Sequence, residues 1–99
     1  MSTAESAAHA QIHLLYHDHR SWLRTLLYRR LRCSETAADL SHDVFVRLLG
    51  RPLPVLQEPR AYLAHIAHGL VVDHHRRRDI ERAWLETLAT LPENVAPSL

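Results

Sequence analysis

The 99-residue chain has no lysine, a single cysteine and only two glycines. Because Cys33 has no second cysteine to pair with, no intramolecular disulfide can form, and we expect a reducing, cytoplasmic environment. No run approaches the roughly 18 apolar residues that a membrane-spanning helix needs. The first residues also lack the basic segment and apolar core of a secretory signal. The sequence therefore predicts a cytoplasmic protein without membrane insertion.

The scarcity of glycine and the lack of alternating apolar and polar residues argue against β-strands. Apolar residues instead recur at helical spacing over residues 11–32, over residues 34–49 behind a predicted N-cap at Ser34, and from Pro59 to about Arg78. No glycine or proline stops this last helix before Thr90. The sequence predicts an all-α protein, a compact bundle of three main helices with a C-terminal helical extension. Its predicted parts are a disordered or frayed N-terminus (1–10), a helical domain (11–91) and the start of a linker (92–99).

The third helical segment has two different faces. At about 100° per residue, its apolar stripe should pack against the bundle, while the opposite face carries histidine, arginine and aspartate. The predicted packing face consists of Tyr62, Leu63, Ile66, Ala67 and Leu70, and the outward face of His65, His68, Val72, His75, Arg76 and Asp79. We expect Trp22, Tyr62 and Trp84 to be core residues. Asp73 and Arg77 have the spacing of a helical ion pair.

All 12 basic residues are arginine, whose planar guanidinium can bind phosphate in a bidentate manner and stack on rings. Charge is segregated along the chain: residues 1–32 and 60–82 are net positive, and residues 33–59 and 83–99 are net negative. By itself, the run Arg76-Arg77-Arg78 is more typical of a solvated helix face than of a nucleic-acid site.

Nine histidines raise the question of a metal site. His9, His13 and His17 follow one another at four-residue steps and could face one way on a helix. Because the chain has one thiol and no evident further ligand set, the sequence predicts no metal site and no cofactor. It also lacks a nucleophile beside an acid/base pair and a glycine-rich phosphate loop, so we expect no enzymatic activity.

Three stretches resemble a known family: LLYHDHRSWLRTLLYRRLRCSETAADLSHDVFVRLL, EPRAYLAHIAHGLVVDHHRRR and ERAWLETLATLPE. They are similar to the first globular domain, region 2, of bacterial extracytoplasmic-function sigma factors, and more narrowly to the ferric-citrate and siderophore-signalling subgroup. The resemblance covers roughly residues 12–97. It implies a compact helical bundle and a second, helix-turn-helix domain that is missing here, so we expect the chain to be a truncated piece of a longer protein.

The resemblance also implies roles for individual residues. In the family, the second helix docks on the clamp helices of the largest subunit of core RNA polymerase, which assigns this role to Asp39, His42, Asp43, Val46 and Arg47. His42 stands where relatives usually have glutamine. The third helix and the loop before it capture the non-template single strand of the minus-ten promoter element. This assigns DNA binding to Arg60, His65, His68, His75, Arg76 and Arg78, and to the loop residues Gly50, Arg51, Leu53, Val55, Gln57 and Glu58.

Relatives often carry an aromatic residue at position 75, where this chain has a histidine. Members of the subgroup are controlled by a membrane-anchored regulator, so such a partner and iron-uptake target genes are further expectations. Two other functions stay open at this point. One is a helical protein-interaction module that never touches DNA, and the other is a free-standing repressor that binds duplex DNA.

Overall fold

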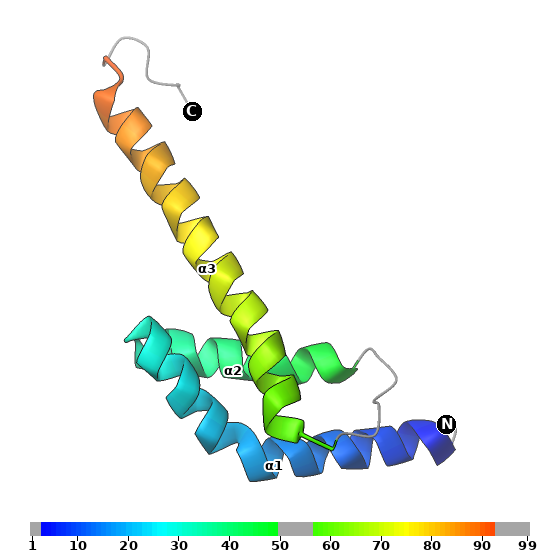
Figure 1. Ribbon diagram of the computed structural model, residues 1–99. Coiled ribbons are helices and arrows are strands. Elements are labelled where there is room, and N and C mark those ends of the chain that lie inside the picture. The colour runs from blue at the N-terminus through cyan, green and yellow to red at the C-terminus, as the bar shows by residue number, and fades with distance from the viewer. Residues whose placement is uncertain (1–2, 50–56, 93–99) are drawn as a thin grey trace.

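The computed structural model describes residues 3–49 and 57–92, with side chains from Ser6 onward. Three helices account for nearly all of these residues: α1 (Thr3–Leu31), α2 (Ser34–Leu49) and α3 (Pro59–Thr90). No strand occurs in the described ranges. The all-α prediction with three main helices is confirmed (Figure 1). None of the described helices combines the length and the hydropathy that crossing a bilayer requires.

Helix α1 begins at Thr3, eight residues before its predicted start at Gln11. The segment that was predicted to be irregular contains several alanines, the residue with the highest helix propensity, and joins the helix without a break. At its other end, the backbone amide of Arg32 donates to the carbonyl of Tyr28 at 2.8 Å. Arg32 has a left-handed φ of 57°, as is common just after a helix ends.

Helix α2 follows after this single left-handed residue and Cys33. The amide of Ala37 donates to the carbonyl of Cys33 at 3.0 Å, so Cys33 occupies the capping position and the predicted N-cap, Ser34, is the first helical residue. Helix α3 begins at Pro59 as predicted, and the amide of Tyr62 donates to the carbonyl of Glu58 at 3.1 Å.

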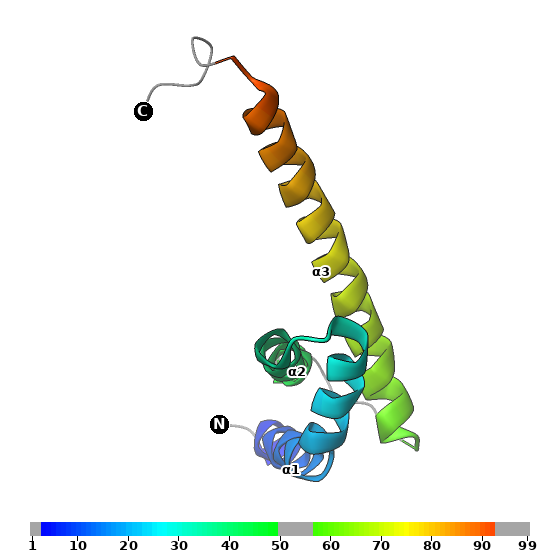
Figure 2. The same ribbon diagram turned by 90° about the vertical axis from the view of Figure 1, so that its left-hand side faces the viewer.

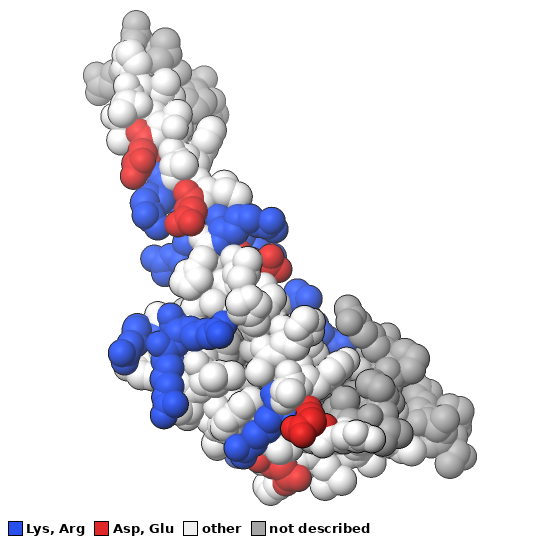
Figure 3. Space-filling model, in the orientation of Figure 1, with Lys and Arg blue, Asp and Glu red and all other residues white. Residues whose placement is uncertain are grey.

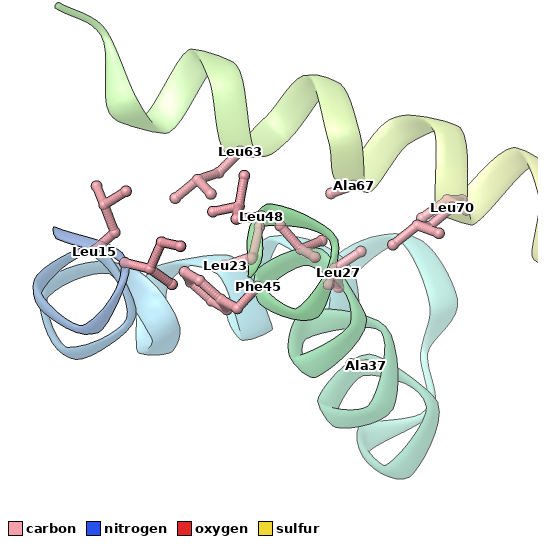
Figure 4. Close-up of a cluster of buried hydrophobic side chains, with 12 residues drawn as sticks. Leu15, Leu23, Leu27, Ala37, Phe45, Leu48, Leu63, Ala67 and Leu70 are labelled. Carbon is pink, nitrogen blue, oxygen red and sulfur yellow. The ribbon is translucent and has the colours of Figure 1, made fainter. Parts of the chain in front are cut away.

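The core lies where α1, α2 and the first half of α3 meet (Figure 4). Leu23, Leu27, Val44, Leu48 and Leu63 are almost completely buried there. Burying each such side chain stabilises the fold by about 1.5–3 kcal/mol. The full set of buried apolar residues is Ile12, Leu15, Leu23, Leu27, Ala37, Val44, Phe45, Leu48, Leu63, Ala67, Leu70 and Val71.

The second half of α3 projects away from this bundle, and the two views agree on this (Figures 1 and 2). The last buried residue of α3 is Val71, and every described side chain from His75 to Thr87 is exposed. The molecule consequently measures 62 × 33 × 18 Å. The prediction that Trp84 belongs to the core is wrong, because its side chain is 61% exposed on the projecting part. Trp22 and Tyr62 are half-buried against the core.

Candidate nucleic-acid interface

Helix α3 holds its outward side chains on a rigid support. Leu63, Ala67 and Leu70 anchor its first half in the core, as predicted. The five predicted DNA-binding residues that follow Arg60 on α3 are all exposed: His65, His68, His75, Arg76 and Arg78. The first four point away from the packed stripe, and Arg78 lies beyond the end of the bundle. In Figure 3, basic side chains gather in two places, midway along α3 and over the end of the bundle where α1 meets α2. The two places come from segments far apart in the sequence.

On its α2-facing edge, α3 borders a hollow of about 210 Å³. Arg47 and Leu48 at the end of α2 and His65, Ile66 and Gly69 on α3 line it. Gly69 has no side chain to fill this space, and a Cβ at this position would meet no atom within 4 Å. The volume is below the roughly 300–1,000 Å³ of pockets for drug-sized ligands, so the hollow suits a single planar ring. We call it the Gly69 pocket.

The opposite edge of α3 contacts α1 through two arginine–histidine pairs. Arg30 of α1 lies with Nη1 at 2.9 Å from Nδ1 of His68. Arg60 of α3 donates from Nε to Nδ1 of His19 at 3.4 Å, and its guanidinium lies 4.9 Å from the centre of the Trp22 ring. Both histidines must be unprotonated at Nδ1 to accept these bonds. Arg60, a predicted DNA-binding residue, is therefore held against α1.

Two exposed ion pairs offset part of the positive charge of α3. Asp73 Oδ1 lies 3.5 Å from Arg76 Nη2, and Asp79 Oδ1 lies 2.9 Å from Arg82 Nη2. The first pair corrects the predicted partner of Asp73, which is Arg76 rather than Arg77. Pairs this exposed contribute about 0–1 kcal/mol each, so a phosphate can compete for these arginines.

The predicted polymerase-docking residues lie on the outer side of α2. Asp39, His42, Asp43, Val46 and Arg47 are all exposed, while Val44 and Phe45 between them are buried. Four of the five share one outward surface, whereas Arg47 also lines the Gly69 pocket. A second hollow, of about 270 Å³, continues from this surface toward α1 and is lined by His9, Ile12, His13, Tyr16, His42, Phe45, Val46 and Leu49. We call it the α1–α2 groove.

The loop residues of the prediction fall into two groups. Gly50, Arg51, Leu53 and Val55 lie outside the described residues. Gln57 and Glu58 are described, and both are exposed directly before α3. In the described parts of the chain, no group of three or more histidine, cysteine, aspartate or glutamate side chains is arranged to hold a metal ion.

Reasoning from the sequence missed two features of this surface. It assigned no role to Gly69, because a lone glycine in a helix does not indicate by itself that a hollow lies beside it. It also assigned none to Arg30, because its contact with His68 joins residues 38 positions apart. The feature of the sequence that could have indicated a role for Arg30 is its position in the basic last turn of α1.

Comparison with known proteins identifies the family. Residues 15–80 match the model of sigma-70 region 2. The chain belongs to the sigma-70 family. This sigma-70 region 2 domain is also similar to the ferric citrate uptake sigma factor FecI of Escherichia coli (strain K12), with 38% identity over 96 residues. That alignment covers 96% of this chain and 56% of the relative, so the chain spans about half of the relative's length. No solved structure gives a significant match.

The resemblance to extracytoplasmic-function sigma factors of the ferric-citrate subgroup is thereby confirmed. The matched range includes all of α2 and the part of α3 that borders the Gly69 pocket. It also includes Arg30 and His68, the pair that joins α1 to α3.

Proposed function

We propose that this domain belongs to an alternative sigma factor that directs transcription initiation by holding the non-template strand of the minus-ten element on α3. The observation that carries the proposal is the Gly69 pocket, in which Arg47 and His65 flank a hollow of single-ring size on an exposed basic helix. Binding an unstacked base requires such a pocket, and holding a single strand requires planar or aromatic groups beside positive charge. Arg47, His65 and the arginines of α3 supply these groups.

The proposal assigns core RNA polymerase to the outer surface of α2. Asp39, Asp43 and Val46 are exposed there on a helix whose opposite side is fixed in the core by Val44 and Leu48. Carboxylates around an exposed valine, 47% exposed at Val46, provide the apolar centre and charged rim of a protein-binding surface. Docking on polymerase places α3 beside the opening promoter, because a few contacts with one strand are too weak to melt DNA unaided.

The target genes and the regulator follow from the relatives. Because the similar protein FecI is named a ferric citrate uptake sigma factor, we propose that the target genes of this domain serve iron uptake. Control by a membrane-anchored regulator is part of the same proposal, since the ferric-citrate subgroup resembles this chain over the whole domain.

Filling the Gly69 pocket tests strand capture. Gly69→Leu should project into the hollow without disturbing the fold, because a Cβ meets no neighbour there. Replacing glycine within a helix should also raise helix stability by up to about 1 kcal/mol. With core polymerase present, we expect at least about fivefold weaker binding of a labelled single-stranded minus-ten oligonucleotide, since one base stack is worth about 1–3 kcal/mol. Gly69→Ala, which leaves most of the hollow open, is the matched control.

Reversing a charge on α2 tests polymerase docking. Asp43→Arg should reduce co-purification with core RNA polymerase while the circular dichroism of the domain stays unchanged, because the side chain is exposed. Asp18→Arg, the same change on an exposed position of α1, should leave co-purification intact. Equal loss in both variants would show a general charge effect and contradict the docking assignment.

A protein-interaction module without DNA contact is the second candidate, and the α1–α2 groove favours it. This hollow is lined mainly by apolar side chains, and further apolar residues, Ile80, Trp84 and Leu85, lie exposed on the projecting part of α3. The interaction-only function predicts that Gly69→Leu and Arg78→Gln bind single strands as the unchanged chain does, while polymerase or another protein is still retained.

A further inference from the structure

Arg30 places a guanidinium from α1 on the edge of α3. Its side chain is exposed, and Nη1 lies 2.9 Å from Nδ1 of His68. The stem of Arg30 also lies beside apolar residues, since it lines a small hollow together with Leu26 and Val71. The guanidinium is thus held at the surface by its hydrogen bond with His68, at the rim of this apolar hollow.

His68 belongs to a row of basic side chains along this edge. His75 follows seven residues later, which is almost two helical turns, so both side chains leave the helix in nearly the same direction about 10 Å apart. Arg78 follows His75 by three residues, so it lies nearly one turn further along the helix and its side chain points in a neighbouring direction. Arg30 therefore adds a cation from another helix to the beginning of the row His68, His75 and Arg78.

One carboxylate lies on this edge: Asp79, eleven residues after His68, leaves the helix in nearly the same direction and pairs with Arg82. Each of Arg76 and Arg82 has an aspartate within 4 Å on α3. Neither Arg30 nor Arg78 has an acidic partner within that distance among residues 3–49 and 57–92. Arginines that lack such a partner are the ones most available to bind a phosphate of a passing strand.

The Gly69 pocket and Arg30 lie on opposite edges of the same stretch of α3. His65 and Gly69 line the pocket, and His68 between them in sequence contacts Arg30. On the helix surface between the two edges, the exposed Gly69 leaves a gap between the side chains of His65 and Val72, which are also exposed. A single strand whose base occupies the pocket can therefore cross α3 here with its backbone close to the helix.

We propose that Arg30 is a phosphate-binding residue, which contacts the backbone of the strand after it crosses α3, and that His68 is the residue that positions its guanidinium. This inference rests on the proposed function, because it needs a base of the same strand in the Gly69 pocket. It extends the strand-binding surface from α3 to α1. The competing explanation is that Arg30 and His68 serve only to fasten α1 to α3.

The salt dependence of strand binding separates these explanations. The experiment measures the affinity of a labelled single-stranded minus-ten oligonucleotide for the chain bound to core polymerase, over a series of salt concentrations. We expect Arg30→Gln to weaken binding about three- to tenfold and to reduce the log–log salt slope by about 0.7, the value for one lost single-strand phosphate contact. The loss should be uniform across base sequences.

Three matched variants control for charge, packing and stability. Arg30→Lys keeps the charge and should retain the salt slope. Arg30→Met keeps an unbranched apolar stem without the charge and should reduce the salt slope as Arg30→Gln does. Arg24→Gln removes the charge of another exposed arginine of α1 that borders Thr25, Tyr28 and Ser34 instead of α3, and should change nothing. Thermal unfolding is recorded for every variant.

The proposal is overturned if Arg30→Gln and Arg30→Met lower the melting temperature but leave the salt slope unchanged, since Arg30 would then only fasten the helices. The same conclusion follows if Gly69→Leu and Arg78→Gln weaken binding and Arg30→Gln does not, an outcome that leaves the proposed function intact. If none of these changes affects strand binding, the proposed function itself fails.

Discussion

Cys33 is an exposed thiol whose environment favours its thiolate. The hydroxyl of Thr36 donates to Sγ at 3.3 Å, and this bond, followed by the backbone amides of Thr36 and Glu35, lowers the pKa of Cys33 below its ordinary value. We expect alkylation by iodoacetamide to show a pH midpoint below that of an unstructured cysteine peptide. Thr36→Val should remove the largest cause and move the midpoint upward, as measured by mass spectrometry over a pH series.

The same shift links the thiol to stability. Because the pKa is lower in the folded chain, the thiolate stabilises the fold above the ordinary thiol pKa, and this contribution is lost as the pH falls through the folded value. The thiol is exposed, so we expect the effect on unfolding to be small. A midpoint identical in the chain, in Thr36→Val and in the peptide would contradict the assigned role of Thr36.

Single residues at helix ends show where prediction from sequence stops. Ser34 was the natural N-cap because serine is strongly preferred there, but the left-handed turn at Arg32 moves the capping position to Cys33. The spacing of Asp73 allowed a partner three or four residues away, and a choice of side-chain rotamer selects Arg76. Differences of one residue depend on local geometry that periodicity does not contain.

Helix α3 contains two regions that should respond differently to the same substitution. Leu63 is completely buried between α1 and α2, so Leu63→Ala should lower the free energy of unfolding by about 2–5 kcal/mol. Leu85 is 63% exposed on the projecting part, and Leu85→Ala should change the free energy of unfolding by less than about 0.5 kcal/mol. Urea unfolding followed by circular dichroism measures both. Similar losses would mean that the projecting part packs against the bundle in solution.

At the level of elements, periodicity predicted the packing face of α3 but not its extent. Leu63, Ala67 and Leu70 are buried as expected, because their spacing produces one continuous stripe on the helix. The stripe continues through Trp84 and Leu85, yet both are exposed, since α1 and α2 end before they could cover them. Apolar spacing identifies a face that can pack, whereas the lengths of neighbouring helices decide whether it does.

At the scale of the molecule, family resemblance predicted more of the site than residue patterns did. The arginine run alone favoured a solvated surface, and only the motif order assigned DNA to α3 and polymerase to α2. The three-dimensional arrangement adds what neither contains, because the Gly69 pocket and the contact of Arg30 with His68 join residues of different helices. Such contacts depend on how helices cross, which a single sequence does not specify.

The molecule combines a packed bundle with a projecting helix, and this division predicts two levels of local stability. Amides of residues 63–71 can exchange only when the bundle opens, because Leu63, Ala67, Leu70 and Val71 fix this stretch of the helix in the core. Amides of residues 76–90 are protected by helical hydrogen bonds alone, and a helix without tertiary packing is marginal in water. We therefore expect hydrogen exchange, measured by mass spectrometry, to be at least about tenfold faster in 76–90 than in 63–71. Leu63→Ala should reduce this difference in exchange rate, because it speeds exchange in the bundle alone. Equal protection of both parts in the unchanged chain would contradict the prediction, since the projecting helix would then be stabilised by tertiary contacts that this structure lacks.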